Sequence, residues 1–177
     1  MFEYFKGVSK GTKMAQETCV ATQETMNWFL LDLDRNGGLE MKTDDSLFVC
    51  RTYYFYTKIV TNPPTSMSTD KMQIFVGACA IQAEDILSEW LQNATGIYGL
   101  EDFFSTFDEG YGDFLSQISR EHKTPEHLSA NEKLNWLKSS SSELVISMIA
   151  NYFNNQSTEL KSMVSNCLSN IRFKLTK

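Results

Sequence analysis

Residues 70–92 read DKMQIFVGACAIQAEDILSEWLQ and carry the clearest helical pattern in the chain. Apolar or small side chains recur there at alternating spacings of four and three residues, at Met72, Val76, Cys79, Ala83, Ile86 and Trp90. Phe75, Leu87 and Leu91 flank this stripe and widen it. So wide a stripe is typical of a helix that is buried on much of its surface. The pattern predicts a central helix, around which an all-α bundle packs.

Similar patterns lie on both sides of this segment. On the N-terminal side they cover about residues 12–31 and 46–61, and on the C-terminal side they cover 100–120 and most of 125–175. Residues 46–61 are rich in β-branched and aromatic side chains, so propensity alone allows a strand. Their length and the spacing of Phe48, Thr52, Phe55 and Ile59 favour a helix instead.

Residues that end, interrupt or cap helices divide these patterns into separate elements. The pair Pro63 and Pro64 ends the segment 46–61. The glycines around Tyr111 predict an interruption in the segment 100–120. Ser129 and Glu132 have the spacing of a capping box, and residues 139–142, all serine, predict a turn between two helices.

The bulk composition fits one helical domain over residues 1–177. The chain is 42% hydrophobic and 21% charged, and its three prolines leave room for long helices. We expect about six or seven helices in a single bundle. Residues 1–12, which contain Gly7 and Gly11, are either a short helix or a loose N-terminal arm.

The charge balance limits the classes of partner. A formal net charge of -6 repels phosphate backbones, so nucleic acid is not expected as a partner. Another protein with a basic surface is the natural partner, although acidity also simply favours solubility. No apolar run reaches the ~18 residues of a membrane span, and the N-terminus lacks a signal-peptide pattern. We therefore expect a cytoplasmic protein with no membrane contact, in which the four cysteines are reduced and buried.

The segment 32–40 reads DLDRNGGLE and contains several oxygen ligands at alternate positions. It resembles the first half of an EF-hand calcium loop, which would extend over 32–43. The resemblance implies calcium as a ligand, held by Asp32, Asp34, Asn36, the Gly38 carbonyl and Glu40. The twelfth loop position is Thr43 where the family has a bidentate Glu. The same residues also make a good turn between two helices, and this simpler interpretation is favoured.

The run 53–56 consists of four aromatic residues. Four consecutive positions of a helix point in different directions, so some of them are expected on the surface. Tyrosine is enriched in protein interfaces, and Tyr53, Tyr54 and Tyr56 are therefore candidate partner-binding residues. Core packing is the competing interpretation.

Two further clusters are weaker candidates, the first for a surface metal site and the second for a catalytic site. His122 and His127 lie near Glu121 and Glu126, but a five-residue spacing does not place both histidines on one helix face. Four carboxylates among aromatic residues are candidates for acid–base chemistry, but the outer face of an amphipathic helix is the favoured explanation; these are Asp102, Asp108, Glu109 and Asp113.

These observations favour a non-enzymatic acidic helical protein that acts by binding another protein, as a regulator, inhibitor or assembly factor. The alternative is a calcium-binding protein that uses the degenerate loop at 32–43. An enzyme is less favoured, because no known catalytic motif occurs in the sequence.

Overall fold

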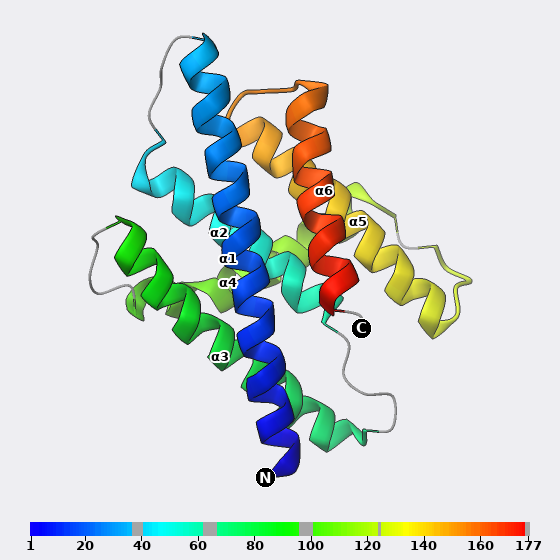
Figure 1. Cartoon of the computed structure of the whole chain (residues 1–177). Helices are drawn as coiled ribbons and strands as arrows, with labels where there is room; N and C mark the ends of the chain where they lie inside the picture. Colours follow the sequence, from blue (N-terminus) through cyan, green and yellow to red (C-terminus); the bar gives the residue numbers. More distant parts are fainter. Residues whose placement is uncertain (37–40, 62–66, 96–100, 124, 176–177) are drawn as a thin grey trace.

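Six helices make up the regular structure of the described residues (Figure 1). The computed structural model describes residues 1–36, 41–61, 67–95, 101–123 and 125–175, with all their side chains except those of 94–95 and 101–109. The helices are α1 (Phe2–Asn36), α2 (Thr43–Val60), α3 (Thr69–Thr95), α4 (Glu101–Glu121), α5 (Ala130–Tyr152) and α6 (Thr158–Leu175). The predicted all-α bundle is confirmed.

Helix α1 is longer than the sequence pattern predicted, at 35 residues. Residues 2–12 are the first turns of α1, so the alternative of a loose N-terminal arm is wrong. The C-terminal end was also misplaced, because α1 continues past Leu31 to Asn36. The residues from Asp32 to Asn36 are therefore helical and do not begin a loop.

Close packing against α3 explains the glycines of α1. A Cβ atom on Gly7 would lie 2.7 Å from the Cβ of Ala78, and one on Gly11 would lie 2.6 Å from the carbonyl oxygen of Cys79. The Cys79 thiol donates a hydrogen bond to the Gly7 carbonyl at 3.1 Å. Glycine lowers helix propensity, but here it lets two backbones approach closely and bury the surface between them.

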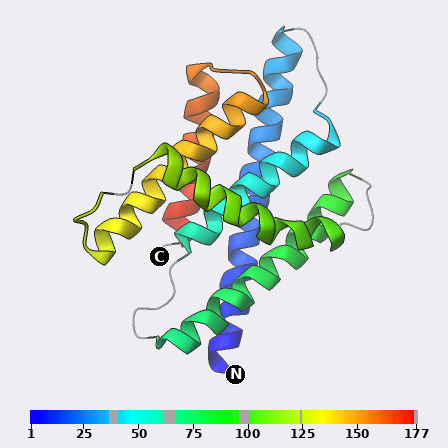
Figure 2. The same cartoon turned by 180° about the vertical axis from the view of Figure 1, so that it is seen from behind.

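Helix α2 forms the middle of the core and is contacted by all five other helices. Its residues 52–57 are buried without a break. Phe55 packs against Tyr111 and Phe114 of α4, which lies across the back of α2 (Figure 2). Residues 46–61 were thus correctly expected to be helical.

The central position expected for the helix at 70–92 is not confirmed. Helix α3 covers that segment and buries Phe75, Ala83, Leu87 and Leu91. The N-terminal half of α3 nevertheless exposes large apolar side chains, since Ile74 is 54% and Ile81 is 56% exposed. Other helices therefore cover only one side of the N-terminal half of α3.

Two predicted interruptions do not occur. Helix α5 begins at the Ser129–Glu132 capping box, as expected, but it runs on through the four serines at 139–142. Ser141 is buried, and its hydroxyl donates to the carbonyl of Lys138 at 3.0 Å. Helix α4 likewise continues through the glycines at 110 and 112. A serine hydroxyl that bonds within its own helix no longer competes with the helical backbone.

Candidate binding groove

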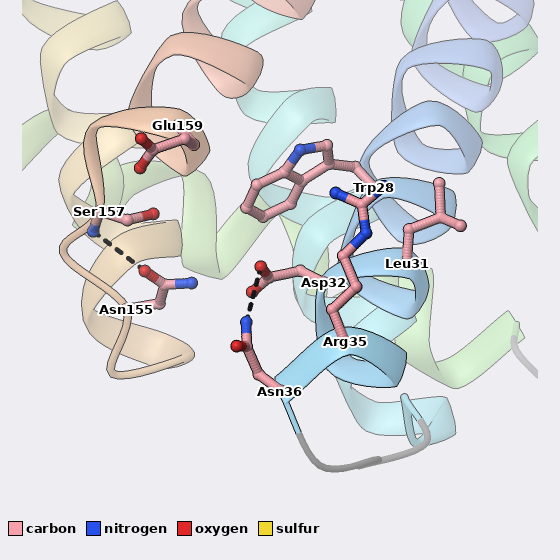
Figure 3. A pocket seen from close by; sticks show the side chains of 8 residues that line it. All are labelled: Trp28, Leu31, Asp32, Arg35, Asn36, Asn155, Ser157 and Glu159. Atoms are coloured by element: carbon pink, nitrogen blue, oxygen red, sulfur yellow. Dashed lines mark hydrogen bonds between the residues drawn. The ribbon is translucent and has the colours of Figure 1, made fainter.

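Two neighbouring cavities lie along the seam between the C-terminal half of α1 and α6. The first has a volume of about 510 Å³ and the second of about 390 Å³. Trp28 and Leu31 line both cavities, so together the cavities form one groove. Figure 3 shows the first cavity, with residues of α1 on one side and Asn155, Ser157 and Glu159 on the other.

One stripe of α1 makes the first wall of the groove. Glu24, Trp28 and Asp32 follow one another at steps of four residues and line it, as does Arg35. The neighbouring stripe, which includes Thr25 and Phe29, is buried in the core. The amphipathic pattern of α1 therefore puts the groove residues beside the core and leaves them accessible.

Helix α6 and the turn before it make the second wall. Met163, Asn166 and Asn170 lie along α6, beside the buried stripe that contains Val164 and Cys167. In the turn, the Asn155 side chain accepts a hydrogen bond from the Ser157 amide at 3.0 Å. The Ser157 hydroxyl also accepts a hydrogen bond from the Leu160 amide. Together these two bonds fix the start of α6 relative to the groove.

The floor of the groove is apolar. Trp28 is half-buried and packs edge-on against the buried ring of Phe29, with ring centroids 5.3 Å apart. Leu31 is 60% exposed, which is high for a leucine that no partner covers. An indole face and a leucine side by side offer a contact area for one apolar side chain of a ligand.

A buried polar network supports this floor from below. The hydroxyls of Thr25 and Tyr53 are 2.7 Å apart, and the Cys167 thiol lies 3.6 Å from the carboxylate of Glu24. Burial raises the pKa of the Cys167 thiol above its usual value. The thiol is therefore protonated at neutral pH and is a poor nucleophile, so it acts here as a structural side chain.

The groove carries more negative than positive charge. Glu24, Asp32 and Glu159 contribute three carboxylates, and Arg35 contributes one guanidinium. Among the cations of α6, which do not line the groove, Lys174 pairs with the Glu17 carboxylate at 2.8 Å. A ligand with two cationic groups would complement this charge pattern.

Amide side chains are unusually frequent along the walls; they belong to Asn27, Asn36, Asn155, Asn166 and Asn170. Asn36 donates to Asp32 at 3.0 Å, and the Asn155 oxygen accepts the bond from Ser157. The side chains of Asn27, Asn166 and Asn170 are exposed. They are available to a ligand as paired donors and acceptors.

Two of the predicted calcium ligands lie in this groove and a third, Asp34, does not. Asp32 and Asn36 line it together, one helical turn apart (Figure 3). Asp34 is exposed and lies two residues from Asp32, which places it on nearly the opposite side of the helix. Gly38 and Glu40 are outside the described residues, so calcium binding over 32–43 stays a prediction. The described ligands are helical although they were expected in a loop, and Asp34 does not share a helix face with Asp32 and Asn36.

The predicted partner-binding tyrosines are in the core, which corrects their assignment to a surface. Tyr53, Tyr54 and Tyr56 are each at most 1% exposed. Two of their hydroxyls have partners inside the protein: Tyr54 donates to Glu84 at 3.0 Å, and the Tyr53 hydroxyl lies 2.7 Å from that of Thr25. In this fold they cannot contact another protein.

The two weaker candidates do not form a site among the described residues. His122 lies 3.6 Å from a carboxylate oxygen of Glu143, while His127 is exposed in the connection to α5. The side chains of Asp102, Asp108 and Glu109 lie outside the described residues. Over the part of the chain that is described, no three His, Cys, Asp or Glu side chains are placed to hold a metal ion.

Sequence reasoning missed the groove itself. The sequence pattern does not single out Trp28, Asn166 or Asn170 as binding residues. One signal was available in α6, since the buried stripe of Leu160, Val164 and Cys167 leaves both asparagines at its edge. The pairing of α6 with α1 could not be seen in a local pattern.

Comparison of the chain with protein-family models, with curated proteins and with solved structures finds no match. Among the described residues, no helix is long and apolar enough to cross a membrane. The groove must therefore be interpreted from its own chemistry.

Proposed function

We propose that this protein is a non-enzymatic binding protein that holds a basic segment of another protein in the groove between α1 and α6. It would act as a regulator, an inhibitor or an assembly factor. The observation that carries the proposal is the composition of the groove, in which the half-buried Trp28 and the exposed Leu31 form an apolar floor between carboxylates. Apolar contact at the centre and charge at the edges is the usual arrangement of a protein interface.

The charge of the whole molecule supports the same partner class. A net charge of -6 attracts a basic protein over a distance, and the groove carboxylates then favour one docking position. Because the attraction is electrostatic, capture of the partner should weaken as salt is raised. The Trp28–Leu31 contact should persist, so binding would fall with salt without vanishing.

The described groove favours recognition over catalysis. Its one thiol, Cys167, is kept protonated by burial. Its other side chains are carboxylates, amides, a guanidinium, a hydroxyl, an indole, a leucine and a methionine, which suit hydrogen bonding, ion pairing and apolar contact.

The test is a quantitative affinity capture from the source cell. The groove variant carries Glu24→Gln, Asp32→Asn and Glu159→Gln, which remove the three groove charges and keep the side-chain shapes. The matched control carries Asp85→Asn, Glu89→Gln and Glu126→Gln, three exposed acids outside the groove. We expect the wild type and the control to retain the same basic partner, and the groove variant to lose it.

Equal retention by all three proteins would refute binding through the groove charges. Loss from both variants would show that only the net charge matters. Either result would remove the basis of the proposal.

A further inference from the structure

We infer that the groove binds its ligand as an extended chain, with the amides of Asn27, Asn166 and Asn170 bonded to the main chain of the ligand. This inference rests on the proposed function and adds the conformation and the side-chain pattern of the bound segment. It begins from the three exposed amides on both walls of the groove. Each carries a carbonyl and an NH₂ group, which match the N–H and C=O groups of a peptide bond.

The spacing of the amides on α6 fits an extended ligand. Asn166 and Asn170 are four residues apart, which is ~6 Å along a helix axis. An extended chain advances ~3.3 Å per residue, so equivalent main-chain groups recur about every 6.6 Å on the same side. A helical ligand would not use these amides, since its own N–H and C=O groups are already bonded internally.

The spacing of side chains on α1 fits the same geometry. Glu24, Trp28 and Asp32 are separated by four residues each, again ~6 Å per step. Alternate side chains of an extended segment are about 6.6 Å apart and point to the same face. One ligand side chain can therefore lie on Trp28, while the side chains two residues before and after it reach the two carboxylates.

The length of the groove sets the length of the segment. From Glu24 to Arg35 the wall is ~16 Å long, which corresponds to about five residues of an extended chain. The side chains of the wall then predict the order of the five ligand residues, which is basic, any residue, apolar, any residue, basic. Glu24 would bind one basic end, and Asp32 together with Glu159 would bind the other.

A display library of random peptides tests this pattern without knowledge of the partner. The full-length protein is immobilised, bound peptides are selected, and the spacing of the enriched residues is read. We expect basic and apolar residues at every second position. An amphipathic spacing of three and four residues would indicate a helical ligand and would overturn the inference, as would the absence of any enrichment.

The role of the amides is tested with one selected peptide. Asn166→Ala and Asn170→Ala should each weaken its binding by about fivefold, the effect of one lost hydrogen bond. Asn93→Ala, at an exposed asparagine of α3, is the matched control and should bind as the wild type does. Methylation of the peptide nitrogens that face α6 should weaken binding by a similar factor.

Unchanged binding by both asparagine variants would overturn the inference. The melting temperature of each variant shows whether it is folded, and unfolding is not expected at exposed positions. Failure here is distinct from failure of the proposed function, which the capture with the three-charge variant decides independently.

Discussion

At the scale of single residues, the four cysteines show most directly how burial sets chemistry. Cys19, Cys50, Cys79 and Cys167 are all free and buried. Burial raises the pKa of the Cys79 thiol to about 11 and that of the Cys19 thiol to about 12. The folded protein therefore keeps its thiols neutral at pH values where an unfolded chain would ionise them.

The thiols predict a loss of stability in mild alkali. In the unfolded chain a thiol ionises near pH 8.5, whereas Cys79 in the folded chain holds its proton to about pH 11. Between these values the unfolded state binds fewer protons, so the free energy of unfolding falls as pH rises. Below about pH 8 this contribution is constant. Urea unfolding at about pH 8 and about pH 10 measures the fall.

The control is Cys79→Ala, which should reduce the alkaline fall relative to the wild type. Burial lowers the pKa of Lys10 and Lys138, and these groups shift stability in the opposite direction. The comparison between wild type and variant cancels the effect of Lys138, whereas Lys10 interacts with the Cys79 thiol itself and contributes to the measured difference. An identical pH dependence in the two proteins would contradict the burial of the Cys79 thiol.

The tyrosines of α2 show what a residue-level pattern cannot predict. Some of Tyr53, Tyr54 and Tyr56 were expected on the surface, because a helix usually has an outer side, and core packing was the competing interpretation. Helix α2 has none over residues 52–57, since other helices cover it on every side. The sequence does not reveal how many neighbours a helix has. The Thr25 hydroxyl that satisfies Tyr53 is also distant in the chain.

At the scale of helices, packing of α1 on α3 depends on the absence of side chains. Cβ atoms at Gly7 and Gly11 would collide with α3, whereas a Cβ on Gly77 of α3 would have no atom within 4 Å. Substitution of an obstructed glycine, such as Gly11, tests helix packing, whereas substitution of the unobstructed Gly77 tests helix propensity alone.

Gly11→Ala should destabilise the protein by about 1–3 kcal/mol, because the new methyl group collides with the backbone of Cys79 and forces the helices apart. Gly77→Ala should stabilise it by up to ~1 kcal/mol, the gain in helix propensity at an unobstructed site. Chemical denaturation of both variants measures the difference. A Gly11→Ala protein as stable as the wild type would be inconsistent with this helix contact.

Helix existence was easier to predict than helix ends. The capping box at Ser129 and Glu132 was identified correctly, and its two side-chain–backbone bonds are present. The serines at 139–142 and the segment from Asp32 to Asn36 were misread as turns. Such residues favour turns by only ~1 kcal/mol, and packing against other helices outweighs a preference of this size.

At the scale of the whole molecule, the fold class was predictable and the site was not. The all-α bundle followed from helical periodicity and three prolines. The groove requires that α1 and α6 lie together, although Trp28 and Met163 are far apart in sequence. Asp32 and Asn36 were identified as ligand-capable, but for a loop and a metal. In the folded chain they belong to a helical wall.

The most direct test of the account is backbone-amide NMR of the isotope-labelled protein, with and without the partner retained in the capture experiment. We expect the largest shift changes within residues 24–36 and 155–170, on the two walls of the groove. Changes centred on residues 1–5 and 72–81, where other large apolar side chains are exposed, would contradict it. In that case the protein would bind its partner elsewhere, and the groove would have no role in recognition.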